Sequence, residues 1–324
     1  MSAAGIGDSV IRLGGNKGLE VELLPFGATI RSIRLFGQEL TLNYPQAADY
    51  QTDEFYLGAT AGRVANRIAK GRFELNGVAY QLDCNNGPNH LHGGVAGFNR
   101  QSWQVLKQQS DTVQLYLRSA DGDQGYPGAL QVWQQFRIVD QQLELSFLAL
   151  SNKDTVLNLT NHCYFNLNND GTSIENHQLQ LTASHYLPTD QSAIPTGERR
   201  AIAGTAFDFS KAKLVGPALR QQDQQLALAN GFDHCFIWQE PDAAELKLMA
   251  VLSSSQSGRQ LEVLSTQPGL QLYTGNFLAS PFAPRQGICL EAQGWPDAIN
   301  QLGFPSTLLK AGELYQQLIV YKFS

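Results

Sequence analysis

No apolar run in this sequence is long enough to span a membrane. None of its apolar stretches approaches the ~20 residues that a helix needs to cross a bilayer. The opening segment, MSAAGIGDSVIRLGG, has neither the basic start nor the long apolar stretch of a secretory signal. We therefore expect a cytoplasmic protein that does not associate with membranes.

Charged residues are scarce, and positive charge is not in excess. Lys, Arg, Asp and Glu make up 16% of the 324 residues, and 29 acidic residues against 23 basic ones give a net charge of −6. No block of Lys or Arg occurs along the chain. Because nucleic acids are recognised by clustered positive charge, we do not expect a nucleic-acid partner. The sequence leaves the oligomeric state open.

Cysteines and the motifs of common cofactor enzymes are also rare or absent. The four cysteines, Cys84, Cys163, Cys235 and Cys289, form no Cys-x-x-C pair, so we expect small buried residues rather than disulfides or zinc ligands. The chain has no G-x-G-x-x-G after a strand, no P-loop, no G-x-S-x-G and no H-E-x-x-H. Any chemistry is therefore expected to use side chains alone, without a cofactor.

Alternating apolar and polar side chains, which are typical of β-strands, dominate the sequence. Residues 72–75 and 78–82 flank Asn76-Gly77, a dipeptide that favours a type I′ turn, and predict a hairpin. Further strands are predicted at residues 112–117, 143–147, 178–181, 245–248 and 261–263. Helical patterns are confined to residues 61–70 and 221–229. With no linker, repeat or strand-helix alternation, we predict one all-β antiparallel domain over residues 1–324.

Two histidines, His90 and His92, lie two residues apart in the segment NNGPNHLHGG and would share one face of an extended strand. A metal site is one interpretation of this pair. Zinc would need a third protein ligand, and no carboxylate or cysteine stands at a recognisable spacing. Hydrogen-bonded loop histidines are therefore the favoured interpretation, and we expect no metal.

Three further polar residues lie in apolar, strand-like surroundings. His162, within NLTNHCYFNL, is either a buried core histidine or a general acid, and the residues alone leave both open. Glu291 follows Ile-Cys-Leu, an apolar setting that would raise its pKa towards that of a useful base. Asp233, within GFDHCF, is equally ambiguous. Aromatic residues beside such polar groups suggest a sugar site, because a sugar has both an apolar face and hydroxyls.

Seven segments, in order and spanning nearly the whole chain, together resemble the galactose mutarotase (aldose 1-epimerase) family. They are GATAGRVANRIAKGRFELNG (58–77), NNGPNHLHGGVAGF (85–98), DGDQGYPG (121–128), NLTNHCYFNL (158–167), GFDHCF (231–236), TQPGLQLYTGNF (266–277) and CLEAQGWPDAIN (289–300). The resemblance implies a large antiparallel β-sandwich, the galactose mutarotase-like supersandwich, with few short helices and a cleft on one sheet. It also argues against a helix at residues 61–70.

The implied function is that of an isomerase which interconverts the α and β anomers of free aldohexoses such as D-galactose and D-glucose. By this resemblance Glu291 is the general base and His162 the general acid. The same resemblance assigns binding of the sugar to six further residues, namely Asn66, Arg67, His92, Tyr164, Asp233 and Gln267. His90 falls outside this set and is expected to be structural, and neither a cofactor nor a metal is implied.

Two residues depart from the family's usual pattern, Cys163 where serine is common and Cys235 where asparagine is common. Both adjoin implied functional residues, so they bear on local packing and sugar preference rather than on the chemistry. Carboxylates close to His162 are expected to raise its pKa. The rival functions are a noncatalytic sugar-binding module and an enzyme for phosphorylated hexoses, which would require a cluster of Arg or Lys.

Overall fold

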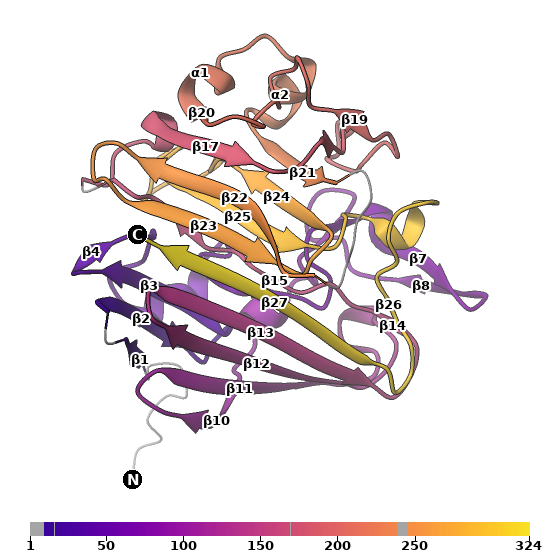
Figure 1. The fold of residues 1–324 in the computed structure, drawn as a ribbon. Helices are drawn as coiled ribbons and strands as arrows, with labels where there is room; N and C mark the ends of the chain where they lie inside the picture. The colour runs from indigo at the N-terminus through magenta and orange to yellow at the C-terminus, as the bar shows by residue number, and fades with distance from the viewer. Residues whose placement is uncertain (1–9, 16, 169, 239–244) are drawn as a thin grey trace.

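Antiparallel β-sheets form most of the structure, a computed structural model that describes residues 10–15, 17–168, 170–238 and 245–324 (Figure 1). Every ladder between its described strands is antiparallel, as the sequence predicted. Residues 1–9, which open the segment examined for a secretory signal, lie outside the described part. Among the described residues, no helix is long and apolar enough to cross a membrane.

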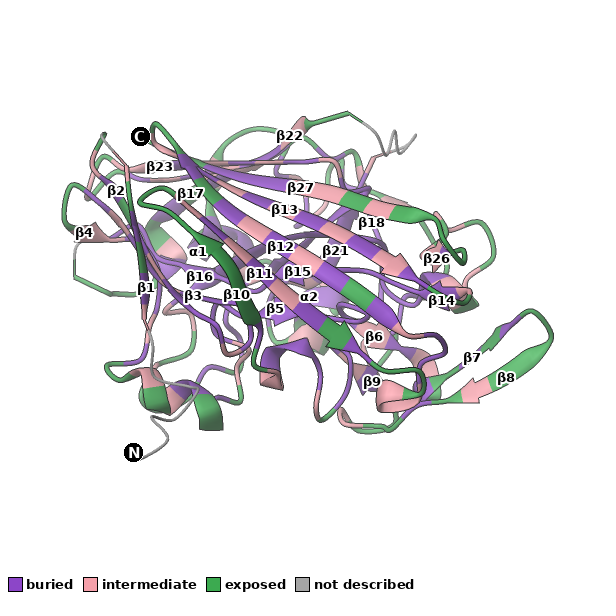
Figure 2. Ribbon diagram, turned by 90° about the horizontal axis from the view of Figure 1, so that it is seen from below, coloured by how far each residue is buried: buried purple, intermediate pink, exposed green. Residues whose placement is uncertain are grey.

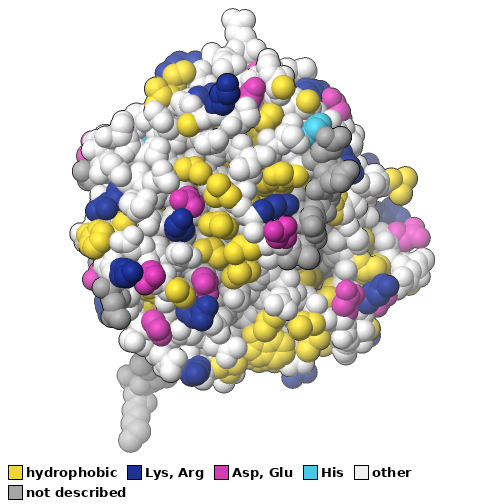
Figure 3. Space-filling view, in the orientation of Figure 1, with side chains coloured by type: hydrophobic (Ala, Val, Ile, Leu, Met, Phe, Trp, Pro, Cys, Tyr) yellow, Lys and Arg dark blue, Asp and Glu magenta, His cyan; other side chains and the backbone are white. Residues whose placement is uncertain are grey.

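The largest sheet has nine strands. In spatial order these are β10 (Gln104–Gln108), β11 (Thr112–Ser119), β12 (Leu130–Val139), β13 (Gln142–Ser151), β27 (Leu314–Phe323), β23 (Gln260–Ser265), β22 (Lys247–Ser254), β17 (His177–Leu181) and β20 (Lys213–Leu214). Buried and partly exposed residues alternate along β12 and β13, which gives the striped strands of Figure 2. On the outer face, acidic and basic side chains are interspersed among apolar ones (Figure 3).

A second sheet of six strands packs against the nine-stranded sheet. Its strands, in spatial order, are β16 (Tyr164–Phe165), β25 (Ile288–Gln293), β24 (Gly269–Tyr273), β21 (Asp233–Ile237), β18 (His185–Tyr186) and β19 (Arg200–Ala201). Leu290 of β25 and Leu272 of β24 belong to the same buried cluster as Phe147 of β13 and Tyr321 of β27. The opposite face of the six-stranded sheet is therefore available to carry polar side chains.

Smaller elements complete the fold. A four-stranded sheet contains β1 (Ile11–Gly14), β2 (Leu19–Leu24), β3 (Thr29–Leu35) and β4 (Gln38–Glu39). The two-stranded pairs are β5 (Thr60–Ala61) with β15 (Thr160–Asn161), β6 (Arg67–Ile68) with β9 (His90–Leu91), β7 (Arg72–Leu75) with β8 (Val78–Gln81), and β14 (Thr155–Val156) with β26 (Leu308–Leu309). The α-helices are α1 (Val215–Leu219) and α2 (Gln224–Ala229), and short 3₁₀ turns span Ala47–Thr52, Ala69–Gly71, Phe98–Arg100, Asp123–Gly125, Ile174–Asn176 and Ala298–Asn300.

The predicted strands are present, except that the strand predicted at residues 245–248 begins only at Lys247, and the helical patterns differ more. The hairpin forms around Asn76-Gly77, where both residues have positive φ. Residues 61–70 contain no α-helix: β6 lies within them, and only the short 3₁₀ turn at Ala69–Gly71 overlaps their end, so the helical periodicity there was misleading. Helix α2 begins at Gln224, three residues later than predicted, because the Asp223 side chain accepts hydrogen bonds from the first-turn amides.

The cysteines of the described chain are all free, and three of them are buried as expected. Cys84 is the exception, because it lies exposed in the loop that follows β8. Its thiol contacts the carbonyl oxygen of Pro88 at 3.1 Å. The prediction that all four cysteines are small buried residues was therefore wrong at this position.

Candidate active site

A polar cleft of about 320 Å³ opens on the face of the six-stranded sheet that points away from the core. This volume lies within the range of small-molecule pockets. Seven of the eight residues predicted to form the site line it: Asn66, Arg67, His92, His162, Tyr164, Asp233 and Glu291. Segments separated by more than 200 residues in the chain therefore meet at one place.

The alternation of side chains along β25 explains how the cleft receives its central carboxylate. Ile288, Leu290 and Ala292 point into the hydrophobic core, so Cys289 and Glu291 point to the opposite face. Every residue of β25 is buried, because one face meets the core and the other lies at the floor of the cleft.

Two rows of side chains cross the cleft face of this sheet. Strand register places Tyr164, Cys289, Tyr273 and Asp233 opposite one another on four successive strands. The adjacent row contains Glu291, Gln271 and Cys235. Directly opposed residues in antiparallel strands have Cβ atoms about 5 Å apart, so each row forms a continuous surface.

The wall opposite the sheet is formed where β6 pairs with β9. Asn66 and His92 both have positive φ, which Asn and His tolerate better than most residues. The amide of Asn66 donates to Nδ1 of His92 at 3.1 Å, and the amide of His92 donates to the carbonyl oxygen of Asn66 at 3.1 Å. Because Nδ1 accepts a hydrogen bond from the backbone, the neutral imidazole of His92 carries its hydrogen on Nε2. Nε2 is therefore a hydrogen-bond donor.

Arg67 is held at one end of the cleft by polar side chains. Its Nε donates to Oδ1 of Asn86 at 3.0 Å, and its Nη1 lies 3.8 Å from Oδ2 of Asp233. Oδ1 of Asp233 accepts a hydrogen bond from Nε2 of Gln271 at 2.6 Å. The sequence analysis quoted Asn86 and Gln271 within motifs without giving either a role. The signal for Gln271 is its register position opposite Glu291, which only strand pairing reveals.

Gln267, which the resemblance assigned to sugar binding, does not line the cleft. Its side chain is buried, and Nε2 donates to the carbonyl oxygen of Leu159 at 3.1 Å and to the hydroxyl of Tyr315 at 3.2 Å. The residue precedes β24, whereas Gln271 lies within it. Gln267 therefore connects neighbouring segments of the fold.

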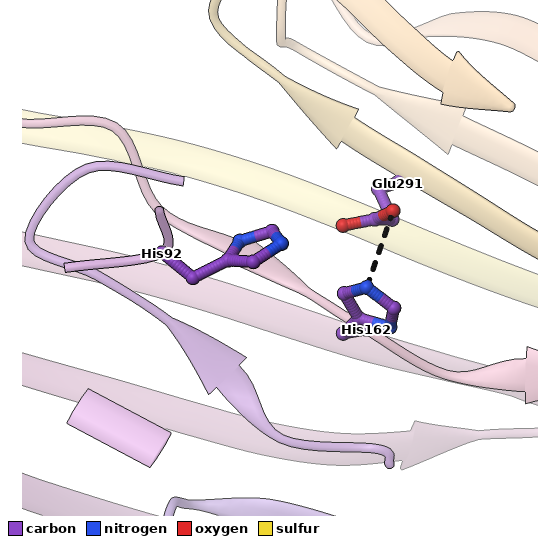
Figure 4. Close-up of side chains that lie close together, drawn as sticks. All are labelled: His92, His162 and Glu291. Carbon is purple, nitrogen blue, oxygen red and sulfur yellow. Dashed lines mark ion pairs between the residues drawn. The ribbon is translucent and has the colours of Figure 1, made fainter. Parts of the chain in front are cut away.

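His162 and Glu291 face each other at the floor of the cleft (Figure 4). Nε2 of His162 lies 3.6 Å from Oε1 of Glu291, and both side chains are almost fully buried. The backbone of His162 is clamped, because its amide donates to the carbonyl oxygen of Ala59 and its own carbonyl oxygen accepts from the amide of Gly58. Oε2 of Glu291 is buried and has no hydrogen-bond partner in the described chain.

Burial shifts both members of this pair towards their neutral forms. It lowers the pKa of His162 to about 4, and the nearby carboxylate of Asp233 only partly opposes this effect. The expectation that carboxylates raise this pKa was therefore wrong, because desolvation outweighs them. Burial also raises the pKa of Glu291 well above its usual value, as its apolar setting predicted. Between the pKa of His162 and that of Glu291, the imidazole Nε2 and the carboxyl group of Glu291 therefore share one proton.

Three ligand-type atoms of His92, His162 and Glu291 lie within 4.8 Å of one another, the one such group among the described residues. The sequence analysis did not foresee Glu291 as a third ligand, because it lies far from the His-x-His pair in the chain. A metal ligand must offer an unprotonated nitrogen, whereas the backbone contact of His92 leaves the hydrogen on Nε2. The arrangement thus fits a hydrogen-bond donor better than a metal ligand.

Aromatic rings form the remaining walls of the cleft. Tyr164 donates its hydroxyl to the carbonyl oxygen of Phe55 at 3.0 Å, so it presents mainly its ring. The ring of Tyr56 packs on His92 with centroids 4.6 Å apart, and Tyr273 and Phe277 also line the cleft. The sequence analysis did not predict these last three residues. Apolar rings around convergent donors and acceptors suit a ligand with an apolar face and several hydroxyls.

His90, expected to be structural, is fully buried outside the cleft lining. Its Nδ1 lies 2.7 Å from the carbonyl oxygen of Asp83, and its Nε2 lies 2.7 Å from the hydroxyl of Tyr126. Both nitrogens are thus engaged by the loop and its neighbour.

Comparison with known proteins shows similarity along nearly the entire chain. Residues 9–322 match the family model described as aldose 1-epimerase. Galactose mutarotase from Bos taurus is 40% identical over 94% of this chain and 91% of the relative, and aldose 1-epimerase from Escherichia coli K12 is 36% identical over 97% and 94%. Among solved structures, galactose 1-epimerase from Lactobacillus acidophilus is 34% identical with a TM-score of 0.88, covering 97% of this chain and 93% of that one. An aldose epimerase homologue from C. elegans reaches a TM-score of 0.90 at 28% identity, covering 98% of each chain.

Proposed function

The chain belongs to the aldose 1-epimerase family of isomerases, and we propose that its His162 and Glu291 interconvert the α and β anomers of free aldohexoses, with D-galactose and D-glucose as substrates. The observation that carries the proposal is the buried acid-base pair, whose facing atoms lie 3.6 Å apart at the floor of the cleft. Such a pair can exchange protons with two neighbouring oxygens of one ligand.

Anomer exchange requires two proton transfers and one bond cleavage. Once the shared proton has passed from Glu291 to Nε2 of His162, Glu291, as general base, removes the proton of the C1 hydroxyl while His162, as general acid, protonates the ring oxygen O5. The C1–O5 bond breaks, its electron pair stays on O5, and C1 becomes an aldehyde carbon. Rotation about C1–C2 presents the other face of the carbonyl, and the same pair with exchanged roles closes the ring. The reaction conserves all atoms and electrons, so one shared proton in the pair is sufficient.

The other polar residues of the cleft hold the sugar ring in place. Asn66, Arg67, His92 and Asp233 offer donors and acceptors to hydroxyls away from C1, and the ring of Tyr164 supplies an apolar surface. Holding the remainder of the sugar restricts motion to the C1 end, which favours reclosure over release of the aldehyde.

The charges that line the cleft argue against phosphorylated hexoses. The lining of the cleft includes one Lys or Arg side chain, that of Arg67, and three carboxyl groups, those of Glu54, Asp233 and Glu291. Arg67 is already engaged with Asn86 and Asp233. A phosphate would require several cations at one place.

Polarimetry tests the proposal directly. The protein should accelerate the decay of optical rotation of fresh α-D-galactose and α-D-glucose without changing the final rotation. Glu291→Gln keeps the shape of the side chain but removes the base, so kcat should fall on the order of 100-fold or more. Glu144→Gln, on the outer sheet, serves as the matched control. Saturable sugar binding without acceleration by the wild type would instead support a binding module, and near-normal kcat in Glu291→Gln would remove the assigned base.

A further inference from the structure

Strand β25 presents two side chains to the two nitrogens of one imidazole. Cys289 and Glu291 lie two residues apart and therefore share a face of the strand. Sγ of Cys289 lies 3.6 Å from Nδ1 of His162, and Oε1 of Glu291 lies 3.6 Å from Nε2 of the same ring. We propose that Cys289 is a positioning residue for His162, whose thiol sets the orientation and tautomer of the catalytic imidazole through Nδ1. This inference rests on the proposed function of His162.

Among the described side chains around His162, the thiol is the hydrogen-bonding partner of Nδ1. Groups from six segments face or influence the ring: Cys289 and Glu291 of β25, Tyr164 of β16, Tyr273 of β24, Asp233 of β21, and Tyr56 and His92 of two separate loops. The aromatic rings contact the imidazole through their ring faces or edges, with centroids 5.1–6.5 Å away. Besides the thiol, the backbone of His162 itself also forms a hydrogen bond with the ring, which raises its pKa.

Close packing around Cys289 holds its thiol in one position. Its side chain is completely buried between those of Tyr164 and Tyr273, its neighbours in the row across the sheet. A side chain packed in this way has little rotational freedom. The thiol is therefore held in place on the same strand that holds Glu291.

A neutral thiol suits an imidazole that both gives and takes protons. Burial raises the pKa of Cys289 well above that of a free thiol, so the S–H group persists. Nδ1 of His162 keeps its hydrogen throughout and donates it to the sulfur, while Nε2 carries the proton that moves. Nε2 delivers this proton to O5 when the ring opens and takes one back when the ring recloses. The sulfur is a weak acceptor for Nδ1, whereas a carboxylate would stabilise the charged imidazolium throughout.

Substitution of Cys289 tests this role, with Cys163→Ala as the matched control. Cys163 is also buried, but it belongs to the hydrophobic core. In Cys289→Ala, kcat should fall on the order of tenfold with KM nearly unchanged, because the imidazole loses its orientation. The acidic limb of the kcat/KM profile should move down by roughly half a pH unit, because the imidazolium form of His162 loses an acceptor that stabilises it more than the neutral form. Cys289→Ser restores a donor and acceptor and should recover most of kcat and the original limb.

Tautomer analysis provides a readout that does not depend on turnover. In ¹⁵N NMR of the neutral imidazole, the wild type should show the hydrogen of His162 on Nδ1, where the sulfur accepts it, and Cys289→Ala should show a mixture. An active wild type with an unchanged profile and tautomer in Cys289→Ala would overturn the inference, as would a serine variant no better than alanine. If the alanine variant fails to fold, the serine variant and the wild-type tautomer decide the question. An inactive wild type would instead contradict the proposed function itself.

Discussion

Glu291 and His162 each have a charged form that burial disfavours, and this shared environment sets how activity should depend on pH. Below about pH 4 His162 gains a proton, so the pair holds two and lacks a base. Well above pH 4.5 the carboxyl of Glu291 loses its proton, so the pair holds none and lacks an acid. At their ordinary pKa values the two groups would give the opposite order, with Glu291 on the acidic limb and His162 on the alkaline limb.

We predict a bell-shaped kcat/KM profile, with an acidic limb near pH 4 and an alkaline limb well above 4.5. The two apparent pKa values of the profile describe His162 and Glu291 together, so a variant that lacks one of them is needed to assign each limb to a residue. In His162→Asn, Glu291 must ionise on its own, and residual activity should show one rising limb at higher pH. The measurement is polarimetry from pH 3.5 to 10. Two unchanged limbs in His162→Asn would show that another group is the acid.

Arg67 and Gln267 should separate sugar binding from structural support. Arg67→Ala removes a charged donor from the cleft, so KM for D-galactose should rise about tenfold while kcat changes less. Gln267→Ala should leave KM nearly unchanged and lower the free energy of unfolding by about 1–3 kcal/mol, because two buried groups lose their partner. Steady-state polarimetry and denaturant titration measure the two effects. A raised KM in Gln267→Ala would restore that residue to the binding site.

His92 provides a prediction about metal. Because the amide of Asn66 donates to Nδ1 of His92, its Nε2 retains a hydrogen and is not free to ligate an ion. Activity should therefore survive exhaustive chelation with EDTA followed by gel filtration. Loss of the rate on chelation, with recovery on addition of zinc, would show that the three convergent side chains bind a metal after all.

At the scale of elements, the β6–β9 pair depends on a close approach of backbone segments. Gly93 follows His92 with φ of +88°, and a Cβ built there would overlap the carbonyl oxygen of Gly62. Backbone rather than a flexible side chain blocks this position, so the loop must move to accept any other residue.

Gly93→Ala should lower the free energy of unfolding by about 3 kcal/mol and also reduce activity, because the shift displaces His92. Gly77→Ala is the matched control. Gly77 also has positive φ but lies in the β7–β8 turn with open space around it, so the cost should be about 1 kcal/mol. Guanidinium titration and polarimetry compare the two variants. If both variants lost the same free energy of unfolding, the cost would come from the positive φ of the glycine and not from the close approach of Gly93 to Gly62.

At the scale of the whole molecule, one hydrophobic cluster reaches from Ile11 near the start of the described chain to Phe323 near its end. It includes side chains of the nine-stranded, six-stranded and four-stranded sheets. Breaking one sheet would therefore expose apolar surface on the others.

This shared core leads us to predict one cooperative thermal transition, in keeping with a single domain over residues 1–324. In differential scanning calorimetry the calorimetric and van't Hoff enthalpies should agree. Saturating D-galactose should raise the midpoint of the same transition, because the sugar binds the folded state. Two resolved transitions, with one insensitive to sugar, would contradict the single-domain prediction.

Many strands, one hairpin and most segments of the cleft could be predicted from the sequence by itself, each for a physical reason. Two-residue alternation predicts strands such as β13, because inward and outward side chains alternate on a sheet with one buried face. Asn76-Gly77 predicts its hairpin because both residues accept positive φ. The family motifs predict the segments of the cleft, and Glu291 occurs in an apolar setting that the structure shows to be buried.

Only the tertiary structure decided which distant side chains are in contact and how burial shifts their pKa values, because both depend on packing and strand register. Gln271 rather than Gln267 contacts Asp233, because strand register places Gln271 opposite Cys235, two residues from Asp233 on the same face of β21. His162 has a lowered pKa because burial outweighs nearby carboxylates, a balance that no local pattern records. Cys289 meets His162 across 127 positions of sequence through the pairing of β16 with β25. Local patterns determine which residues alternate and turn, whereas the contacts between distant segments exist only once the sheets have paired and excluded water.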